Sequence, residues 1–228
     1  MRKHLFHSVL GNLQKHSLFG MSDFIVNNSI SLHYLGTNNM KQAKILTVDE
    51  TKRVLAVIDA NRHAERNRAV FFLSHLAGLR ACEIASLRLI DVVDDNWVVK
   101  SQVVLEKNMT KGNERHRVLI STKLRKHLQR YVDSTCLNCS ITDPFIRSQK
   151  GSSFSPMTIV QLFGRLFAKS GIKGASSHSG RRSFITALDT QGVSVRVIQA
   201  LARHSDLSLT QRYIDVSDSR LENAVELL

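Results

Sequence analysis

Cysteine is scarce in this chain, which has 3 cysteines among 228 residues. An odd and low number of cysteines excludes the paired framework of a small secreted disulfide protein and favours the cytosol. Cys136 and Cys139 form a Cys-x-x-Cys pair, but no second pair follows at the spacing of a zinc ribbon. Carboxylate clusters that would hold a catalytic metal are also missing from the sequence. We therefore expect neither a metal nor another cofactor.

Long apolar segments are missing too. The longest nearly apolar run, residues 69–79, is interrupted by Ser74 and His75 and is far shorter than the roughly 20 residues that span a bilayer. Near the N-terminus, polar residues between positions 12 and 16 break any apolar core of a signal peptide. We therefore expect a cytoplasmic protein that has no membrane partner.

Acidic residues are too few to balance the basic ones. The chain has 19 Asp and Glu against 32 Lys and Arg, which leaves a net charge of +13 at pH 7. Such a positive field favours a polyanionic partner, and nucleic acid is favoured over a membrane because no basic amphipathic helix stands out. The basic residues alternate with core-type residues instead of forming a tail, which predicts a folded basic surface.

Most of the sequence that is present has helical periodicity. A hydrophobic content of 43% with only 6% aromatic residues is typical of a mostly helical single domain. Thr47 and Glu50 predict a capping box at the start of the first helix, and Ser155 followed by Pro156 predicts the start of a later one. The expected helices cover about residues 47–58, 67–79, 121–131, 155–167, 180–190 and 194–202, with a turn of helix starting at Glu83 and a short helix carrying Tyr213.

A change of period to two marks a small sheet. The expected strands are residues 97–99, 103–105 and 117–120, with a basic turn at 111–113. The fold class is therefore predicted as α+β, mainly helical, with a small three-stranded antiparallel sheet.

The two ends of the chain differ from this main part. Residues 1–44 hold no sustained period and are expected to form an N-terminal extension that is partly disordered. Residues 45–228 are expected to form one domain, which includes a C-terminal helix over 217–228 with an apolar stripe. That stripe either covers the domain's own core or docks on another molecule.

Several short motifs with basic and nucleophilic residues follow one another along the chain. The first is Gly78-Leu79-Arg80-Ala81-Cys82-Glu83-Ile84-Ala85-Ser86-Leu87. The second is Lys111-Gly112 with a basic segment after it, and Lys107 is the alternative to Lys111 in this motif. The third is His178-x-x-Arg181, and the fourth places His204 nine positions before Tyr213. Each motif alone is weak, whereas their combined order is specific.

This order of motifs resembles the tyrosine recombinases, the integrase family of site-specific DNA recombinases. The resemblance covers about residues 45–228 and implies the helical catalytic fold of that family. It also implies double-stranded DNA with specific recombination sites as partner and a homotetramer assembled on DNA from a chain that is monomeric in solution. A bacterial or phage-encoded protein associated with the nucleoid is expected on the same grounds.

The resemblance assigns roles to individual residues. Tyr213 is expected to attack a DNA phosphorus and form a 3′-phosphotyrosyl link, with His178 as its base or hydrogen-bond partner. Lys111 is expected to protonate the leaving 5′-oxygen. Arg80, Arg181 and His204 are expected to stabilise the charge on the phosphate, and Glu83 to hold an arginine. Expected DNA-binding residues are Arg182, Arg203, Arg212, Lys107, Arg115 and Arg117.

Other interpretations remain open at this stage. Tyr131 and Tyr34 are competing phenols, but Tyr131 lies on an apolar helix face and Tyr34 in the irregular extension. His75, His116 and His127 are predicted to be ordinary surface or core histidines. A type IB topoisomerase uses a similar set of residues, and residues 187–202 could instead form the helix-turn-helix of a DNA-binding regulator. Most recombinases also carry a further helical domain of about a hundred residues, which the extension of forty-odd residues cannot supply.

Overall fold

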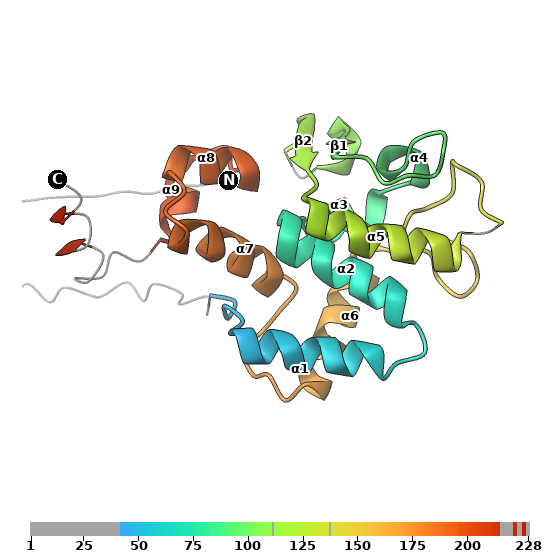
Figure 1. Ribbon diagram of the computed structural model, residues 1–228, viewed down its shortest axis with the longest axis horizontal. Helices are drawn as coiled ribbons and strands as arrows, with labels where there is room; N and C mark the ends of the chain where they lie inside the picture. The colour runs from blue at the N-terminus through green and yellow to red at the C-terminus, as the bar shows by residue number, and fades with distance from the viewer. Residues whose placement is uncertain (1–41, 111, 137, 215–220, 223–224, 227–228) are drawn as a thin grey trace, which may run out of the picture. The chain divides into compact units, whose positions relative to one another are not determined.

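Helices make up most of the part that the computed structural model describes, namely residues 42–110, 112–136, 138–214, 221–222 and 225–226 (Figure 1). Within these residues, no helix combines the length and apolar character needed to cross a membrane. All of the elements belong to one compact unit, Met40–Leu228. In order they are α1 (Val48–Asp59), α2 (Ala64–Ala77), α3 (Ala81–Ser86), α4 (Leu89–Val92), β1 (Gln102–Leu105), η1 (Lys107–Met109), β2 (His116–Leu119), α5 (Thr122–Thr135), α6 (Pro156–Lys169), α7 (Ser179–Thr190), α8 (Val195–Ala202) and α9 (Leu207–Gln211).

Helix α2 is the centre of this unit. Its residues from Ala69 to Ser74 are all buried, and it contacts α1, α5 and α7 on different sides (Figure 1). A helix that is apolar around most of its circumference is stable only when other elements cover it. The carboxyl end of α2 therefore lies inside the protein, where α3 and α7 meet it.

Two predicted helix starts are confirmed, those at Thr47 and Ser155. The N–H of Glu50 donates to the Thr47 hydroxyl at 3.2 Å and the N–H of Thr47 donates to the Glu50 carboxylate at 3.1 Å, which is the expected capping box. The Ser155 hydroxyl accepts from the N–H of Thr158 at 3.1 Å, with Pro156 at the first helical position. Helix α2 begins three residues before the expected Asn67, because its first turn lacks the apolar periodicity on which that prediction rested.

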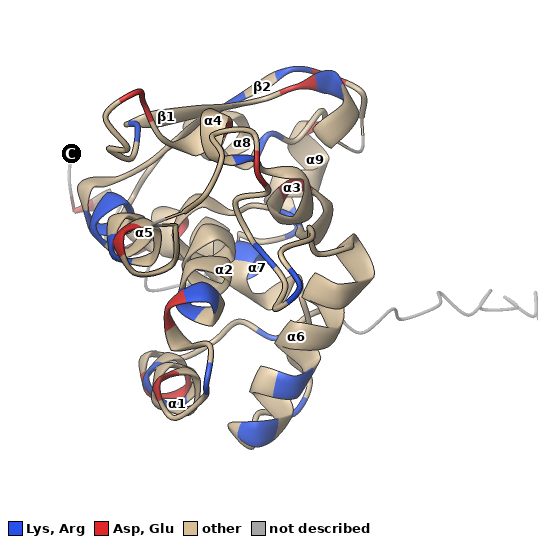
Figure 2. Ribbon diagram, turned by 90° about the vertical axis from the view of Figure 1, so that its right-hand side faces the viewer, with Lys and Arg blue, Asp and Glu red and all other residues tan. Residues whose placement is uncertain are grey.

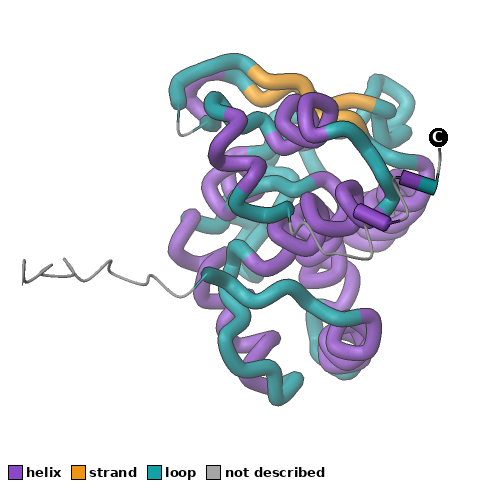
Figure 3. The backbone as a smooth tube through the Cα atoms, turned by 90° about the vertical axis from the view of Figure 1, so that its left-hand side faces the viewer, coloured by secondary structure: helices purple, strands orange, loops and turns teal. Residues whose placement is uncertain are grey.

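The sheet has two strands in the described residues, not the predicted three. Strands β1 and β2 pair antiparallel with Val103 opposite Val118 and lie along one edge of the helical layer (Figure 3). The third expected strand is reduced to a single bridge between Val99 and Val93. Trp97 has φ 62°, a left-handed conformation that interrupts an extended strand. The predicted fold class, mainly helical with a small antiparallel sheet, is otherwise confirmed.

Helices α7 and α8 form a small apolar cluster of Ile185, Ile198 and Ala202, against which Tyr213 packs. Helix α9 ends at Gln211, so Tyr213 lies just past the helix end and not within it, where its N–H donates to the Thr210 carbonyl at 3.0 Å. Most of the predicted C-terminal helix, 217–228, lies outside the described residues, as does the predicted extension up to residue 41.

A segment at the start of the described chain is tied to α7. The N–H of Leu46 donates to the Ser183 hydroxyl at 2.9 Å, and the Arg182 guanidinium donates to the Ala43 carbonyl at 2.8 Å. The N–H of Lys44 donates to the Gly174 carbonyl at 3.0 Å. These bonds fix the amino end of α7, where the third motif begins.

Candidate active site

One cavity collects the candidate residues of three separate motifs. It has a volume of about 540 Å³. Five of the six predicted catalytic residues line it, and the sixth, Lys111, lies outside the described residues between two lining neighbours, Thr110 and Gly112. The lining residues are Arg80, Thr110, Gly112, Glu114, His116, His178, Arg181, Arg203, His204, Ser205, Leu209 and Tyr213.

Arg80 reaches this cavity because the chain turns sharply after α2. Gly78 ends the helix in the left-handed conformation with φ 62°, which glycine adopts without strain. A Cβ there would lie 2.7 Å from the Phe184 ring, so α7 also requires glycine at this position. Arg80 then becomes the N-cap of α3, and its side chain is 25% exposed towards the cavity.

Arg181 comes from the first turns of α7 and is buried, with 5% of its surface exposed. Its guanidinium donates to the Gly78 carbonyl at 2.6 Å and to the Ala202 carbonyl. Burial, together with the guanidiniums of Arg80 and Arg203, lowers the pKa of Arg181 to about 9, so it stays charged at neutral pH. A fixed cation in a place of low solvent access interacts strongly with an anion.

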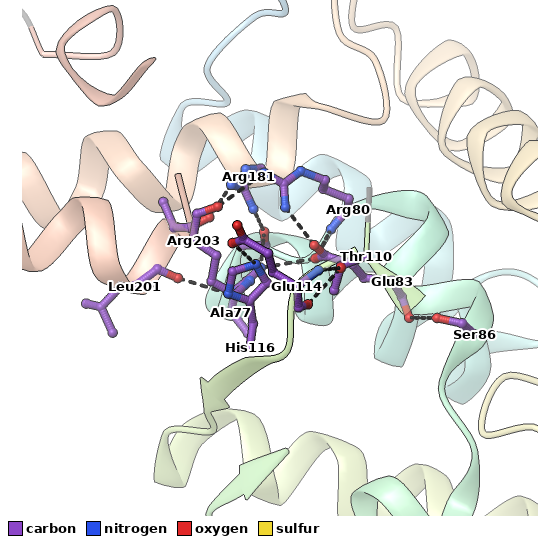
Figure 4. Close-up of polar contacts among 12 residues, drawn as sticks. Ala77, Arg80, Glu83, Ser86, Thr110, Glu114, His116, Arg181, Leu201 and Arg203 are labelled. Carbon is purple, nitrogen blue, oxygen red and sulfur yellow. Dashed lines mark hydrogen bonds and ion pairs between the residues drawn. The ribbon is translucent and has the colours of Figure 1, made fainter. Parts of the chain in front are cut away.

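Arg203 meets these two arginines from the end of α8 (Figure 4). Its side chain is 2% exposed and donates to the Glu83 carboxylate at 3.1 Å and to the Gly78 carbonyl at 3.0 Å. The interpretation of Arg203 as a solvated surface charge is therefore wrong, whereas its contact with DNA phosphates stays a prediction. The buried carboxylate and the carbonyls at the end of α2 draw the guanidinium inward, because they need donors.

Glu83 is the buried anion at the centre of this group, with 0% exposure. Its carboxylate accepts from the Arg80 guanidinium at 2.6 Å and from the Arg80 N–H at 2.8 Å, in addition to Arg203. Burial opposes the charged form, but the charge of Arg203 and the charge and N–H of Arg80 outweigh it and lower the pKa of Glu83. Glu83 thus holds two arginines, as an ionised carboxylate.

His204 and Tyr213 face each other across the end of the cavity. Their rings are nearly parallel, with an interplanar angle of 22° and 5.9 Å between centroids. The Thr210 hydroxyl lies 2.9 Å from the His204 Nδ1, and the Arg182 guanidinium lies 5.7 Å from the centre of the Tyr213 ring. Burial and the charges of Arg181, Arg80 and Arg203 lower the pKa of His204 to about 4, so its imidazole is neutral at pH 7.

His178 is the N-cap of α7 and is exposed. Its N–H donates to the Ser176 hydroxyl at 3.2 Å. Because His178 and Arg181 are separated by three positions at the start of one helix, both reach the same cavity. The sequence motif predicts this arrangement.

The hairpin supplies residues that the sequence motifs did not single out. His116 on β2 and Glu114 line the cavity, with the His116 Nε2 3.8 Å from the Glu114 carboxylate. Thr110 also lines it and holds the hairpin, since its hydroxyl donates to the Glu114 carbonyl at 2.8 Å. The strand period could have indicated His116, because it lies two residues before the buried Val118 and on the same strand face.

The remaining DNA-binding candidates lie around this region. Arg182 is half-buried, while Arg212, Lys107, Arg115 and Arg117 are exposed. Arg115 pairs with Glu106 at 3.3 Å. Lys107 is in η1 and is not among the described residues that line the cavity. Basic residues also colour the hairpin, α5 and α6 in Figure 2.

The model of the phage integrase family matches residues 44–220, more than half of the chain. The chain belongs to the phage integrase family. Among relatives of this integrase-family chain, Tyrosine recombinase XerA of Pyrococcus horikoshii is 31% identical over 183 residues, which cover 80% of the chain and 60% of XerA. The chain thus spans about 60% of the length of this curated relative.

Solved structures show the same fold. The crystal structure of XerA recombinase matches with a TM-score of 0.65 and 24% identity over 81% of this chain and 62% of that one. The XerH site-specific recombinase bound to palindromic difH substrate, in a post-cleavage complex, matches with a TM-score of 0.62 and 22% identity over 79% of this chain and 51% of that one.

Proposed function

We propose that this chain is a site-specific DNA recombinase that cuts and rejoins DNA through a 3′-phosphotyrosyl intermediate. The observation that carries the proposal is the single cavity that collects Arg80, His178, Arg181, His204 and Tyr213 from motifs up to 133 residues apart in the chain. We assign residues 45–228 to the catalytic domain and residues 1–44 to an extension. Membership of the integrase family and the Xer relatives support this activity.

The nucleophile is Tyr213. Its phenolic oxygen attacks the scissile phosphorus and forms a P–O bond to tyrosine, while the P–O5′ bond breaks. An unperturbed phenol has a pKa of about 10 and must lose its proton during attack. His178, which lines the same cavity, accepts that proton or orients the phenol. The second half of the reaction reverses these steps with a new 5′-hydroxyl, so the bond energy is retained.

The anionic phosphate is held by a preorganised pair of guanidiniums. Arg181 is fixed by two backbone carbonyls and Arg80 by Glu83, so neither must reorganise when charge builds up on the non-bridging oxygens. Planar guanidiniums match two phosphate oxygens at once, as a lysine does not. His204 adds a neutral donor if its Nδ1 accepts from Thr210, because its Nε2 then carries the proton.

The leaving 5′-oxygen receives its proton from Lys111. Its neighbours Thr110 and Gly112 line the cavity, whereas Lys107 is not among the described lining residues. This difference supports Lys111 over Lys107 as the general acid. Lys107, Arg115 and Arg117 are exposed beside this hairpin and are assigned to DNA phosphates, together with Arg182 and Arg212.

The partner is double-stranded DNA with specific recombination sites, on which four chains assemble. The net charge of +13 supports a polyanionic partner, and XerH has been solved bound to its difH substrate. The C-terminal segment 217–228 is assigned to contacts between neighbouring protomers. Analytical ultracentrifugation on DNA of a chain ending at Ser219 tests this assignment, and unchanged self-association would refute it.

The cleavage activity is tested with suicide substrates made from the DNA that flanks the gene. Nicked substrates release a short 5′-hydroxyl fragment after attack, which traps the covalent protein–DNA adduct. We expect an adduct with the parent chain and none with Tyr213→Phe, which keeps the ring but lacks the nucleophile. Recombinant products from plasmids with paired sites would distinguish a recombinase from a topoisomerase, which relaxes plasmids lacking any such site.

A further inference from the structure

Arg203 has a backbone conformation that arginine rarely adopts. It caps the carboxyl end of α8 with φ 56° and ψ 48°, in the left-handed region. A side chain with a Cβ is disfavoured there, so other interactions must stabilise the turn. The Arg203 guanidinium supplies such interactions, because it donates to Glu83, Gly78, Ala77 and Leu201.

The three consecutive residues 202, 203 and 204 each belong to the candidate active site or bond to one of its arginines. The Ala202 carbonyl accepts from Arg181, and the Arg203 carbonyl accepts from Arg80 at 3.5 Å. His204 follows directly and lines the cavity. The position of this turn therefore sets the positions of both phosphate-binding arginines and of the histidine relative to one another.

Arg203 also changes how Glu83 interacts with Arg80. One carboxylate oxygen, Oε2, accepts from Arg203 and from the Arg80 N–H, which leaves Oε1 for the Arg80 guanidinium. Without Arg203, Arg80 would be the remaining cation bonded to this fully buried carboxylate among the described residues. The carboxylate would then hold the Arg80 guanidinium more closely and oppose its contact with an anion in the cavity.

We propose that Arg203 is a positioning residue that neutralises Glu83 and fixes the turn before His204, so that Arg80 and Arg181 present their guanidiniums to the phosphate. This inference rests on the proposed recombinase function. The Arg203 guanidinium is buried and donates to protein acceptors, so it acts through the other two arginines.

Arg203→Gly is the sharpest variant, because glycine adopts the left-handed conformation without strain and only the side chain is lost. We expect the rate of adduct formation at saturating DNA to fall roughly 10- to 100-fold, with DNA affinity changed less than about twofold. Arg203→Lys should recover only part of the rate, because an ammonium lacks the planar fork that joins Glu83 to Gly78. The matched control is a substitution of Arg196, an exposed arginine of α8. Glycine would weaken the helix at this position, so we choose Arg196→Met, which should keep the parent rate of adduct formation.

A second variant separates positioning from packing. If Arg203 acts by neutralising Glu83, then Glu83→Gln should partly restore cleavage to Arg203→Gly, because the unbalanced carboxylate is gone. If Arg203 only packs α8 against α2, the losses of cleavage rate caused by the two substitutions should add. The double variant should then cleave more slowly than either single variant. Parent-like cleavage by Arg203→Gly, or a loss that Glu83→Gln deepens, would overturn the proposal.

A structural measurement covers variants that lose activity for other reasons. In ¹⁵N-labelled protein, the Arg80 Nε–Hε resonance should shift in Arg203→Gly and return towards its parent position in the double variant, without DNA. Unchanged Arg80 resonances would refute the positioning role even if cleavage falls. Failure of the parent to form any adduct would instead refute the proposed function, so the two failures are distinguishable.

Discussion

The imidazole of His204 lies against the phenol ring of Tyr213, with ring centroids 5.9 Å apart. Because the chain connecting them runs through α9, these rings are held by the segment 204–213, which also supplies Thr210, the partner of His204 Nδ1. The proposed nucleophile, Tyr213, and the proposed hydrogen-bond donor to the phosphate, His204, therefore belong to one local structure. A substitution of either residue should therefore alter the position of the other ring.

Replacing His204 with alanine should lower the single-turnover cleavage rate about 100-fold, the typical effect of losing one donor to a developing oxyanion. Thr210→Val keeps the ring but removes its hydroxyl partner, so a smaller loss is expected. Since the pKa of His204 is lowered to about 4, the cleavage rate should show no titration of this residue between about pH 5.5 and 8. Parent-like cleavage by His204→Ala would contradict the assignment.

Lys111→Ala should abolish cleavage of ordinary DNA and retain cleavage of DNA with sulfur in place of the bridging 5′-oxygen. A thiol has a pKa of about 8.5, far below that of an alcohol, so a thiolate leaves without a proton from the general acid. Lys107→Ala is the matched control on the same hairpin, and its cleavage rate relative to the parent should be the same on both substrates. Rates measured on the two DNAs for each variant decide between the lysines.

Gly180→Ala should destabilise the protein by about 1–3 kcal/mol. An added Cβ would lie 2.5 Å from the Ser74 hydroxyl and 3.2 Å from its backbone carbon, so α7 must move away from α2. Gly164→Ala is the control, since nothing lies within 4 Å of its added Cβ on α6, and it should be neutral or stabilising. Urea unfolding of both variants measures the difference, and Ser74→Gly should recover part of the loss in Gly180→Ala.

Acid should destabilise the fold through His75. Burial, and secondarily the charge of Lys123, lowers the pKa of His75 to about 4 from an ordinary value of 6.5. The unfolded chain therefore binds more protons between these values, so the stability contributed by neutral His75 is complete above about pH 6.5 and is lost as the pH falls towards 4. His75→Leu should reduce the loss of unfolding free energy across this window by about 3 kcal/mol, whereas the slopes of unfolding free energy against pH should agree between pH 7 and 8.

Local features of this fold were predictable from the sequence, and features that join distant segments were not. The capping box at Thr47 and the pairing of His178 with Arg181 depend on spacings of three residues. The inward turn of Arg203 depends on its left-handed backbone and on Glu83, which lies 120 residues earlier. A basic residue next to an expected catalytic histidine reads as surface charge until its partner is known.

The sheet and the hairpin follow the same rule. The run 97–99 has β-type residues, but Trp97 leaves the extended conformation, and no pattern of side chains predicts that. His116 was interpreted as an ordinary histidine because its role as a cavity residue depends on how β2 approaches α3 and α7. One cavity contains Arg80, Arg181, His204 and Tyr213, which are residues that the order of motifs had placed in one active site.

The hydrogen bonds between distant segments also constrain when the site can form during synthesis. The Gly78 carbonyl accepts hydrogen bonds from Arg181 and Arg203, which lie 103 and 125 residues later in the chain. The N–H of Leu46 donates to Ser183, which lies 137 residues later. At about 5–20 residues per second, these groups stay unpaired for several seconds or more on the ribosome. Arg181 and Arg203 can therefore bond to the end of α2 only after residues 181 and 203 have been synthesised, so a shorter nascent chain lacks the arrangement that we propose binds phosphate.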